Sequence, residues 1–132
     1  MKSTVNKKTA IIVIVLFFVV AAISIAFPLL YLRQGFIGVV AKDENSFSLN
    51  IEWMNGTDSH SLNLNKDDAL KVDFNVEKGS IYLLIQDPEE NSIYSGNGSE
   101  ANHFEVNILE KGIYSLTVRG NHAKGSLLVS KK

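Results

Sequence analysis

The sequence divides into one long apolar run and a longer stretch in which apolar and polar positions alternate. The apolar run extends from Ala10 to Leu32, contains 23 residues and has no charged side chain. An α-helix rises about 1.5 Å per residue, so this run spans about 34 Å, enough to cross a hydrocarbon core of about 30 Å. A helix packed on a soluble core would carry a polar stripe, which this run lacks. The pattern predicts a single transmembrane helix over residues 10–32.

Basic residues flank the predicted helix and indicate its orientation. Lys2, Lys7 and Lys8 precede it, whereas all 14 Asp and Glu residues follow it. The positive-inside rule therefore predicts a cytoplasmic N-terminus and an extracytoplasmic C-terminal part in a single-pass membrane protein. We expect Tyr31 and Arg33 to lie at the outer membrane interface, where aromatic rings and snorkelling cations are favoured.

A cleaved signal peptide is the competing interpretation of the same run. Ser24 and Ala26 are small residues in the spacing that precedes a cleavage site after Ala26. The run is longer than the usual 7–15-residue apolar region of a signal peptide, and it continues through Leu29 to Leu32. These observations favour an uncleaved signal anchor, and cleavage after Ala26 stays open as the alternative.

The remaining hundred residues predict an all-β domain close to the membrane. Alternation with a period of two is clear in several segments, and the segment 81–85 is apolar on both faces. We expect hairpins or turns at Asn55-Gly56, at Lys78-Gly79 and over Gly120 to Gly125. Strands are expected at 36–41, 47–53, 58–64, 70–77, 81–85, 93–94, 104–108, 114–118 and 126–129.

About eight short strands at this spacing predict an antiparallel β-sandwich, jelly-roll-like, behind a single transmembrane helix. The predicted parts are a cytoplasmic tail at 1–9, a signal anchor at 10–32, a juxtamembrane segment with the first strand at 33–45, and an extracytoplasmic domain at 46–132. No long Pro-, Ser- or Gly-rich stalk separates the anchor from the domain.

Composition narrows the class of protein. The chain has 132 residues and no cysteine, which excludes disulfides and thiolate chemistry, and which favours a prokaryotic surface protein. After the predicted helix, 10 Lys and Arg residues face 14 Asp and Glu residues, a net charge of −4. Such a domain is not expected to bind nucleic acid. The glycosylation sequons at Asn55 and Asn97 are interpreted first as turns, with glycosylation left open.

The last sixty residues resemble the bacterial and archaeal pre-peptidase C-terminal domain. The matching stretches, within residues 70–129, are LKVDFNVEKGSIYLLIQDP, IYSGNGSEANHFEVNI, and the close from GIYSLTVRG to GSLLV. The resemblance implies a small jelly-roll sandwich. Members of that family usually follow a catalytic domain and help secretion or substrate attachment, whereas this sequence carries an anchor, so only the fold is carried over. Calcium binding, known in some members, stays open.

No catalytic motif is present. The sequence lacks His-Glu-x-x-His, Gly-x-Ser-x-Gly and a Walker-type loop. His60, His103 and His122 are isolated, and the acids at 67–68 and 87–90 are interpreted as solvated turn residues rather than metal ligands. We therefore predict no enzyme activity and no cofactor, metal or catalytic residue. A pocket that joins a histidine to a carboxylate would favour an enzyme instead.

Two aromatic residues are candidates for binding surfaces. Trp53 shares the face of Phe47, Leu49 and Ile51 by alternation, which predicts a core position rather than a sugar platform. Tyr82 lies on the opposite face of its strand from Ile81, Leu83 and Ile85, together with Leu84. If no other segment covers them, Tyr82 and Leu84 would form an interaction patch with Leu109, Ile113 or Leu128; coverage by an edge loop or by residues 36–40 is the alternative.

These observations predict a non-catalytic binding or interaction module held at the cell surface. Its expected partners are the lipid bilayer, through residues 10–32, and a protein or other component of the cell envelope. The alternative is an accessory subunit of a membrane complex that assembles through the transmembrane helix.

Overall fold

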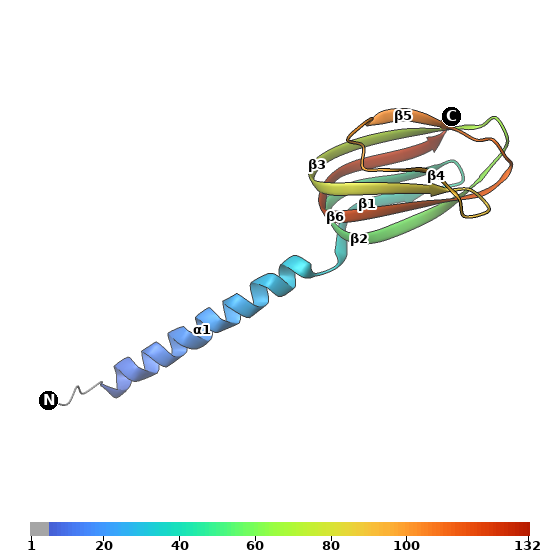
Figure 1. Ribbon diagram of the computed structural model, residues 1–132. Coiled ribbons are helices and arrows are strands. Elements are labelled where there is room, and N and C mark those ends of the chain that lie inside the picture. Colours follow the sequence, from blue (N-terminus) through green and yellow to red (C-terminus); the bar gives the residue numbers. More distant parts are fainter. Residues whose placement is uncertain (1–5) are drawn as a thin grey trace. The chain divides into compact units, whose positions relative to one another are not determined.

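The computed structural model describes residues 6–132, without the side chains of residues 25–32, and divides into two compact units at Arg33 and Gln34 (Figure 1). The first unit contains one helix and the second contains all the strands. The elements are α1 (Lys7–Leu32), β1 (Gly35–Lys42), β2 (Ser46–Leu64), β3 (Ala69–Gln86), β4 (Ser92–Gly96), β5 (His103–Asn107) and β6 (Gly112–Lys131).

Helix α1 is apolar on every side that the structure describes. From Ile11 to Val20 each side chain is exposed, for example Phe17 at 72%. Its window Lys7–Ser24 has a mean hydropathy of 2.2, and it is the one helix among the described residues that is long and apolar enough to cross a membrane, a test that a signal sequence also passes. A helix that is apolar on all sides has no polar face to turn toward water.

All six strands join one antiparallel sheet. The order is β1-β2-β6-β3-β4, and β5 also pairs with β3. Strands β2, β3 and β6 have 19, 18 and 20 residues, far above the usual five or six. Their two halves pair separately, because the register of β6 shifts against β2 between Ile51 and Gly56 and against β3 between Val76 and Ser80.

The long strands fold back on themselves at these register shifts. The rings of Phe47 and His60 lie 5.6 Å apart although 13 residues separate them, a distance of about 43 Å along a straight strand. We call the first layer the sheet of β1, β5 and the adjoining halves of β2, β6 and β3. The second layer contains β4 and the other halves of the same long strands. The fold is an antiparallel β-sandwich behind a helix, as the sequence predicts.

The expected strand count and three expected turns are wrong. The structure has six strands rather than about eight, because Asn55-Gly56, Lys78-Gly79 and the segment from Gly120 to Gly125 lie inside continuous strands. Gly56, Gly79 and Gly125 have positive φ angles of 155°, 64° and 148°. At these positions the glycines allow β-bulges that bend a strand from one layer into the other, instead of hairpin turns.

One hydrophobic core lies between the layers. Inward side chains from both halves of each long strand form a single cluster, and fully buried members include Leu49, Leu83, Leu116 and Leu127. Tyr114 is also buried there; its hydroxyl donates a 2.6 Å hydrogen bond to the backbone oxygen of Glu110, and burial raises its pKa. No described side-chain nitrogen or oxygen is buried without a hydrogen-bond partner.

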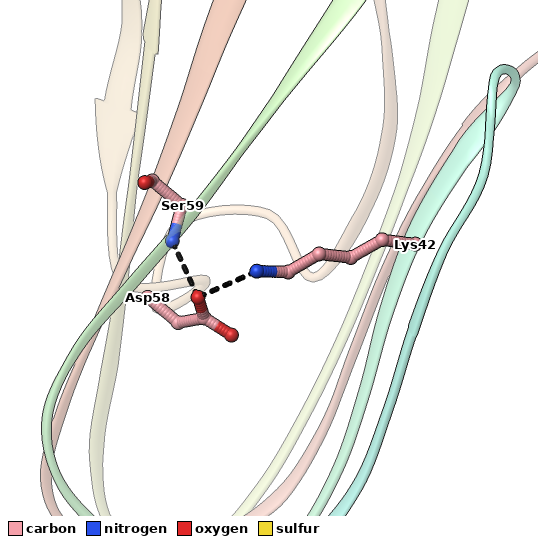
Figure 2. Close-up of polar contacts among 3 residues, drawn as sticks. All are labelled: Lys42, Asp58 and Ser59. Atoms are coloured by element: carbon pink, nitrogen blue, oxygen red, sulfur yellow. Dashed lines mark hydrogen bonds and ion pairs between the residues drawn. The ribbon is translucent and has the colours of Figure 1, made fainter.

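Charged contacts close the side of the sandwich where β1 faces the second half of β2. Lys42 ends β1 and its Nζ lies 2.8 Å from Oδ1 of Asp58, which also accepts a 2.8 Å hydrogen bond from the backbone N–H of Ser59 (Figure 2). Nearby, Nε2 of His60 lies 2.7 Å from the backbone oxygen of Asp43. These contacts join an edge strand of the first layer to an edge strand of the second.

Trp53 does not lie in the core, contrary to the alternation on which its expected position rests. The register shift after Ile51 inserts an extra residue, so Met54 takes the next inward position and is 2% exposed. Trp53 becomes half-buried on the outer face of the first layer, paired with Ile37. A bulge of this kind reverses the facing of every residue after it.

Candidate functional site

The outer face of the second layer carries Tyr82 and Leu84. Inward neighbours Ile81, Leu83 and Ile85 are fully buried, whereas Tyr82 is 41% exposed and Leu84 is half-buried. The alternation in the sequence is therefore confirmed. Residues 36–40 form part of β1 in the first layer, so they do not cover this face.

Cross-strand pairing brings three strands together around Tyr82. Arg119 of β6 pairs with Tyr82 of β3 on one side and with Thr57 of β2 on the other. In the next row Thr117 pairs with Leu84. These outward side chains line an open hollow of about 850 Å³. Its remaining lining residues are Gln34, Asn55, Gly56, Ser80, Gly120 and Asn121. We call it the outer hollow.

A second hollow adjoins the first at Tyr82. It measures about 550 Å³ and is bounded by the loop from Gly96 to Ala101 and by Tyr94 and Phe104. The rings of Tyr94 and Phe104 lie 4.7 Å apart, and burial raises the pKa of the Tyr94 phenol. Tyr82 thus lies between the two hollows and lines both of them.

The outer hollow is electrostatically distinct from the rest of the domain. Arg119 is its one charged lining residue, and no Asp or Glu lines it, although the domain has a net charge of −4. Arg119 is exposed and forms no ion pair with any side chain in the described part of the chain. The hollow therefore offers a guanidinium beside an aromatic ring, hydroxyls and amides.

The other apolar residues expected in this patch lie elsewhere. Leu109 is 81% exposed in the turn before β6, and Leu128 lies on the outer face of the first layer. Ile113 shares the outer face with Arg119 but is six residues away along β6, about 20 Å. The surface around Tyr82 is consequently mixed rather than apolar. Its role in binding stays a prediction.

The predicted membrane-interface residues belong to the end of the first unit. The side chain of Tyr31 is outside the described residues, and Arg33 is exposed directly after α1. No contact tests their place at a bilayer. Their role stays a prediction.

One hollow does join a histidine to acidic residues. It is lined by Asp43, Glu44 and His60 among others, and measures about 680 Å³. However, His60 contacts the backbone oxygen of Asp43, and the carboxylate of Asp43 accepts hydrogen bonds from the backbone N–H of Asn45 and the hydroxyl of Ser46. These bonds, the first above all, hold its pKa below the usual range. The carboxylate of Asp43 thus caps the turn before β2, and His60 contacts the backbone of the same turn.

Several other acids and one other histidine are also engaged in local contacts. Asp68 accepts from the backbone N–H of Asn65 at 2.8 Å, Asp87 accepts from Glu89 and Asn91, and His103 contacts the carboxylate of Asp73. Asn97 accepts from the backbone N–H of Ser99, as in a turn. Within residues 6–132 no group of three or more His, Asp and Glu side chains has the arrangement of a metal site.

Comparisons with known proteins identify the fold and no family. No family model matches the chain, and no curated protein matches it. Among solved structures, it is similar to PliG of Aeromonas hydrophila, a periplasmic inhibitor of g-type lysozyme, with 17% identity and a TM-score of 0.51 over 70% of this chain and 90% of that one. Accessory secretory protein 1, 2 and 3 of Streptococcus pneumoniae matches with 11% identity and a TM-score of 0.37, over 76% and 96%.

Proposed function

We propose that the chain is a non-catalytic interaction module, held in a membrane by α1 with its β-sandwich on the extracytoplasmic side. The outer hollow around Tyr82 and Arg119 carries the proposal, because it combines an aromatic anchor with a guanidinium that forms no ion pair within the described part of the chain, on a face that no other segment of the second unit covers. Tyr and Arg are the residues most enriched among those that dominate binding at protein interfaces. The partner is a protein that presents a carboxylate to Arg119.

Three further observations support this assignment. PliG, one of the solved structures that resemble this chain, is an inhibitor of a lysozyme. No family model matches the chain, and His60 and His103 are engaged by turn backbone and by the carboxylate of Asp73. The surface of α1 is apolar on all sides, which suits a lipid environment. In this proposal α1 is an anchor that is not cleaved. The resemblance to the pre-peptidase C-terminal domain also stays a proposal.

The experiment places a photo-crosslinking amino acid at Tyr82 in the native membrane. We expect one discrete adduct with a different protein, and at least about a tenfold loss of it in Arg119→Glu, because a buried charge pair is replaced by repulsion. Lys71→Glu is the matched control: it makes the same charge change on an exposed strand position of the first layer, and it should leave the adduct intact.

Two results would contradict the proposal. One is an adduct at position 82 that contains only the chain itself. The other is equal loss in Arg119→Glu and Lys71→Glu, which would indicate a general charge effect. An adduct that persists in Arg119→Glu but disappears when α1 is exchanged for an unrelated anchor would favour a complex that assembles through the helix instead.

A further inference from the structure

Edge strand β1 has an apolar outer face. Ile37 and Val39 are 62% and 66% exposed, and Ala41 follows on the same face. Trp53 of β2 pairs with Ile37, and its ring atom Cζ3 lies 3.0 Å from where a Cβ of Gly35 would stand, so the indole extends the same face. We call Ile37, Val39, Ala41 and Trp53 the β1 strip.

The other edges of the sandwich do not share this character. At the opposite edge of the first layer, β5 presents His103 and Glu105, and Glu105 pairs with Lys132 at 2.9 Å. At the two edges of the second layer, the second half of β2 presents Thr57 and Ser59, and β4 presents one large apolar side chain, Ile93, which is 38% exposed. Among the edge strands that the structure describes, only β1 therefore carries large apolar side chains that are more than 60% exposed.

The apolar edge is the one joined directly to the apolar helix. Only Arg33 and Gln34 separate α1 from β1, and two extended residues reach about 7 Å. The segment from Arg33 to Lys42 contains two cations and no acid, because the first acidic residue of the chain is Asp43. Lys42 pairs with Asp58 on the other face of β1, so Arg33 is the cation that adjoins the apolar face. A cation beside exposed apolar side chains suits the boundary between headgroups and acyl chains.

A second copy of the chain is the rival occupant, and the edge is poorly built for it. Sheet extension needs a regular row of backbone groups, whereas the register of β1 against β2 breaks at Gly38, whose φ is 152°. Lys42 points inward to Asp58 at the end of the same edge (Figure 2). Inward charges and bulges are the devices that protect edges from strand pairing. A binding partner would therefore contact the apolar side chains of β1 rather than pair with its backbone.

The geometry points to the β1 strip as a lipid-binding surface that lies in the interfacial layer of the bilayer. The inference rests on the proposed membrane insertion of α1. The strip fixes which side of the sandwich faces the lipid, so that the domain is held at the membrane at two points rather than by a free tether. The expected ligand is the glycerol and upper acyl region of a phospholipid, without a requirement for anionic headgroups.

Trp53 is the sole tryptophan, so it reports contact between the strip and lipid directly. The full chain is reconstituted in phosphatidylcholine vesicles whose acyl chains carry bromine near the headgroup end. We expect Trp53 emission to fall at least about twofold relative to unbrominated vesicles, because an interfacial strip lies about 5–10 Å into this region. In the double variant Ile37→Ser, Val39→Ser, the quenching should be lost.

The matched control and a second readout distinguish the outcomes. Leu128→Ser changes an apolar residue that is 37% exposed on the outer face of the first layer but lies on β6, and it should retain the quenching. Insertion of α1 is measured separately, as resistance to alkaline extraction. A chain that resists extraction while Trp53 stays unquenched would overturn the strip and leave the anchor intact. A chain that is extracted would overturn both.

Discussion

Leu127→Ala is expected to lower the free energy of unfolding of the sandwich by about 2–5 kcal/mol, a large share of the 5–15 kcal/mol that a domain of this size has. Leu127 is 1% exposed and belongs to the core between the layers. Removing its branched end leaves a cavity that the surrounding strands fill only in part. The measurement is urea unfolding of the full chain in detergent micelles, followed by the emission of Trp53.

Leu128 supplies the matched control for this prediction. It is the next residue of β6, its side chain is the same, and it is 37% exposed on the outer face. Leu128→Ala should cost less than about 1 kcal/mol, since exposed positions contribute little to stability. Equal losses of unfolding free energy in the two variants would contradict the assignment of Leu127 to the core and of Leu128 to the outer face.

Gly79→Ala is expected to destabilise the sandwich by about 2–4 kcal/mol, from backbone strain and a steric clash together. Gly79 has a φ of 64°, and a Cβ there would lie 2.3 Å from the backbone oxygens of Asn121 and His122. Both oxygens belong to β6, which crosses β3 at this corner. The added methyl group therefore forces the two strands apart where they bend. The midpoint and slope of urea unfolding measure the effect.

Gly56→Ala is the control for the corner. Its φ of 155° is also unfavourable for a side chain, but no atom lies within 4 Å of the added Cβ. Gly56→Ala should therefore lower the free energy of unfolding through backbone strain alone. We expect this loss to be at least about 1 kcal/mol smaller than the loss in Gly79→Ala. A loss in Gly56→Ala as large as that in Gly79→Ala would contradict the close crossing of β3 and β6.

The sequence predicted which residues face inward better than it predicted where strands end. Alternation placed Leu83 inside and Tyr82 outside correctly, because a period of two is a local property. The turns at Asn55-Gly56 and Lys78-Gly79 were wrong for a physical reason. A hairpin turn and a β-bulge can both be built on a glycine with positive φ, and only the pairing partners, which are distant in sequence, decide between them.

The same limit applies to the candidate site. Tyr82 and Leu84 were found from their own strand, but Arg119 and Thr57 join them only through the order β2-β6-β3 and its register. The alternation of polar Thr117 and Arg119 with apolar Leu116 and Val118 indicates in the sequence that the two polar residues face solvent. The residues around them do not indicate which strands lie on either side. Trp53 was misplaced because one extra residue in a bulge reverses the facing of a strand.

The central claim is that α1 stays in the membrane and holds the sandwich outside, and the absence of cysteine makes a direct test simple. Single cysteines replace Asn6, before α1, and Glu89, an exposed residue of the β3–β4 turn. A membrane-impermeant maleimide is applied to intact and to permeabilised spheroplasts. We predict that Glu89→Cys is labelled in both and Asn6→Cys only after permeabilisation. Labelling in the reverse pattern, or a mature chain that begins after Ala26, would contradict the claim.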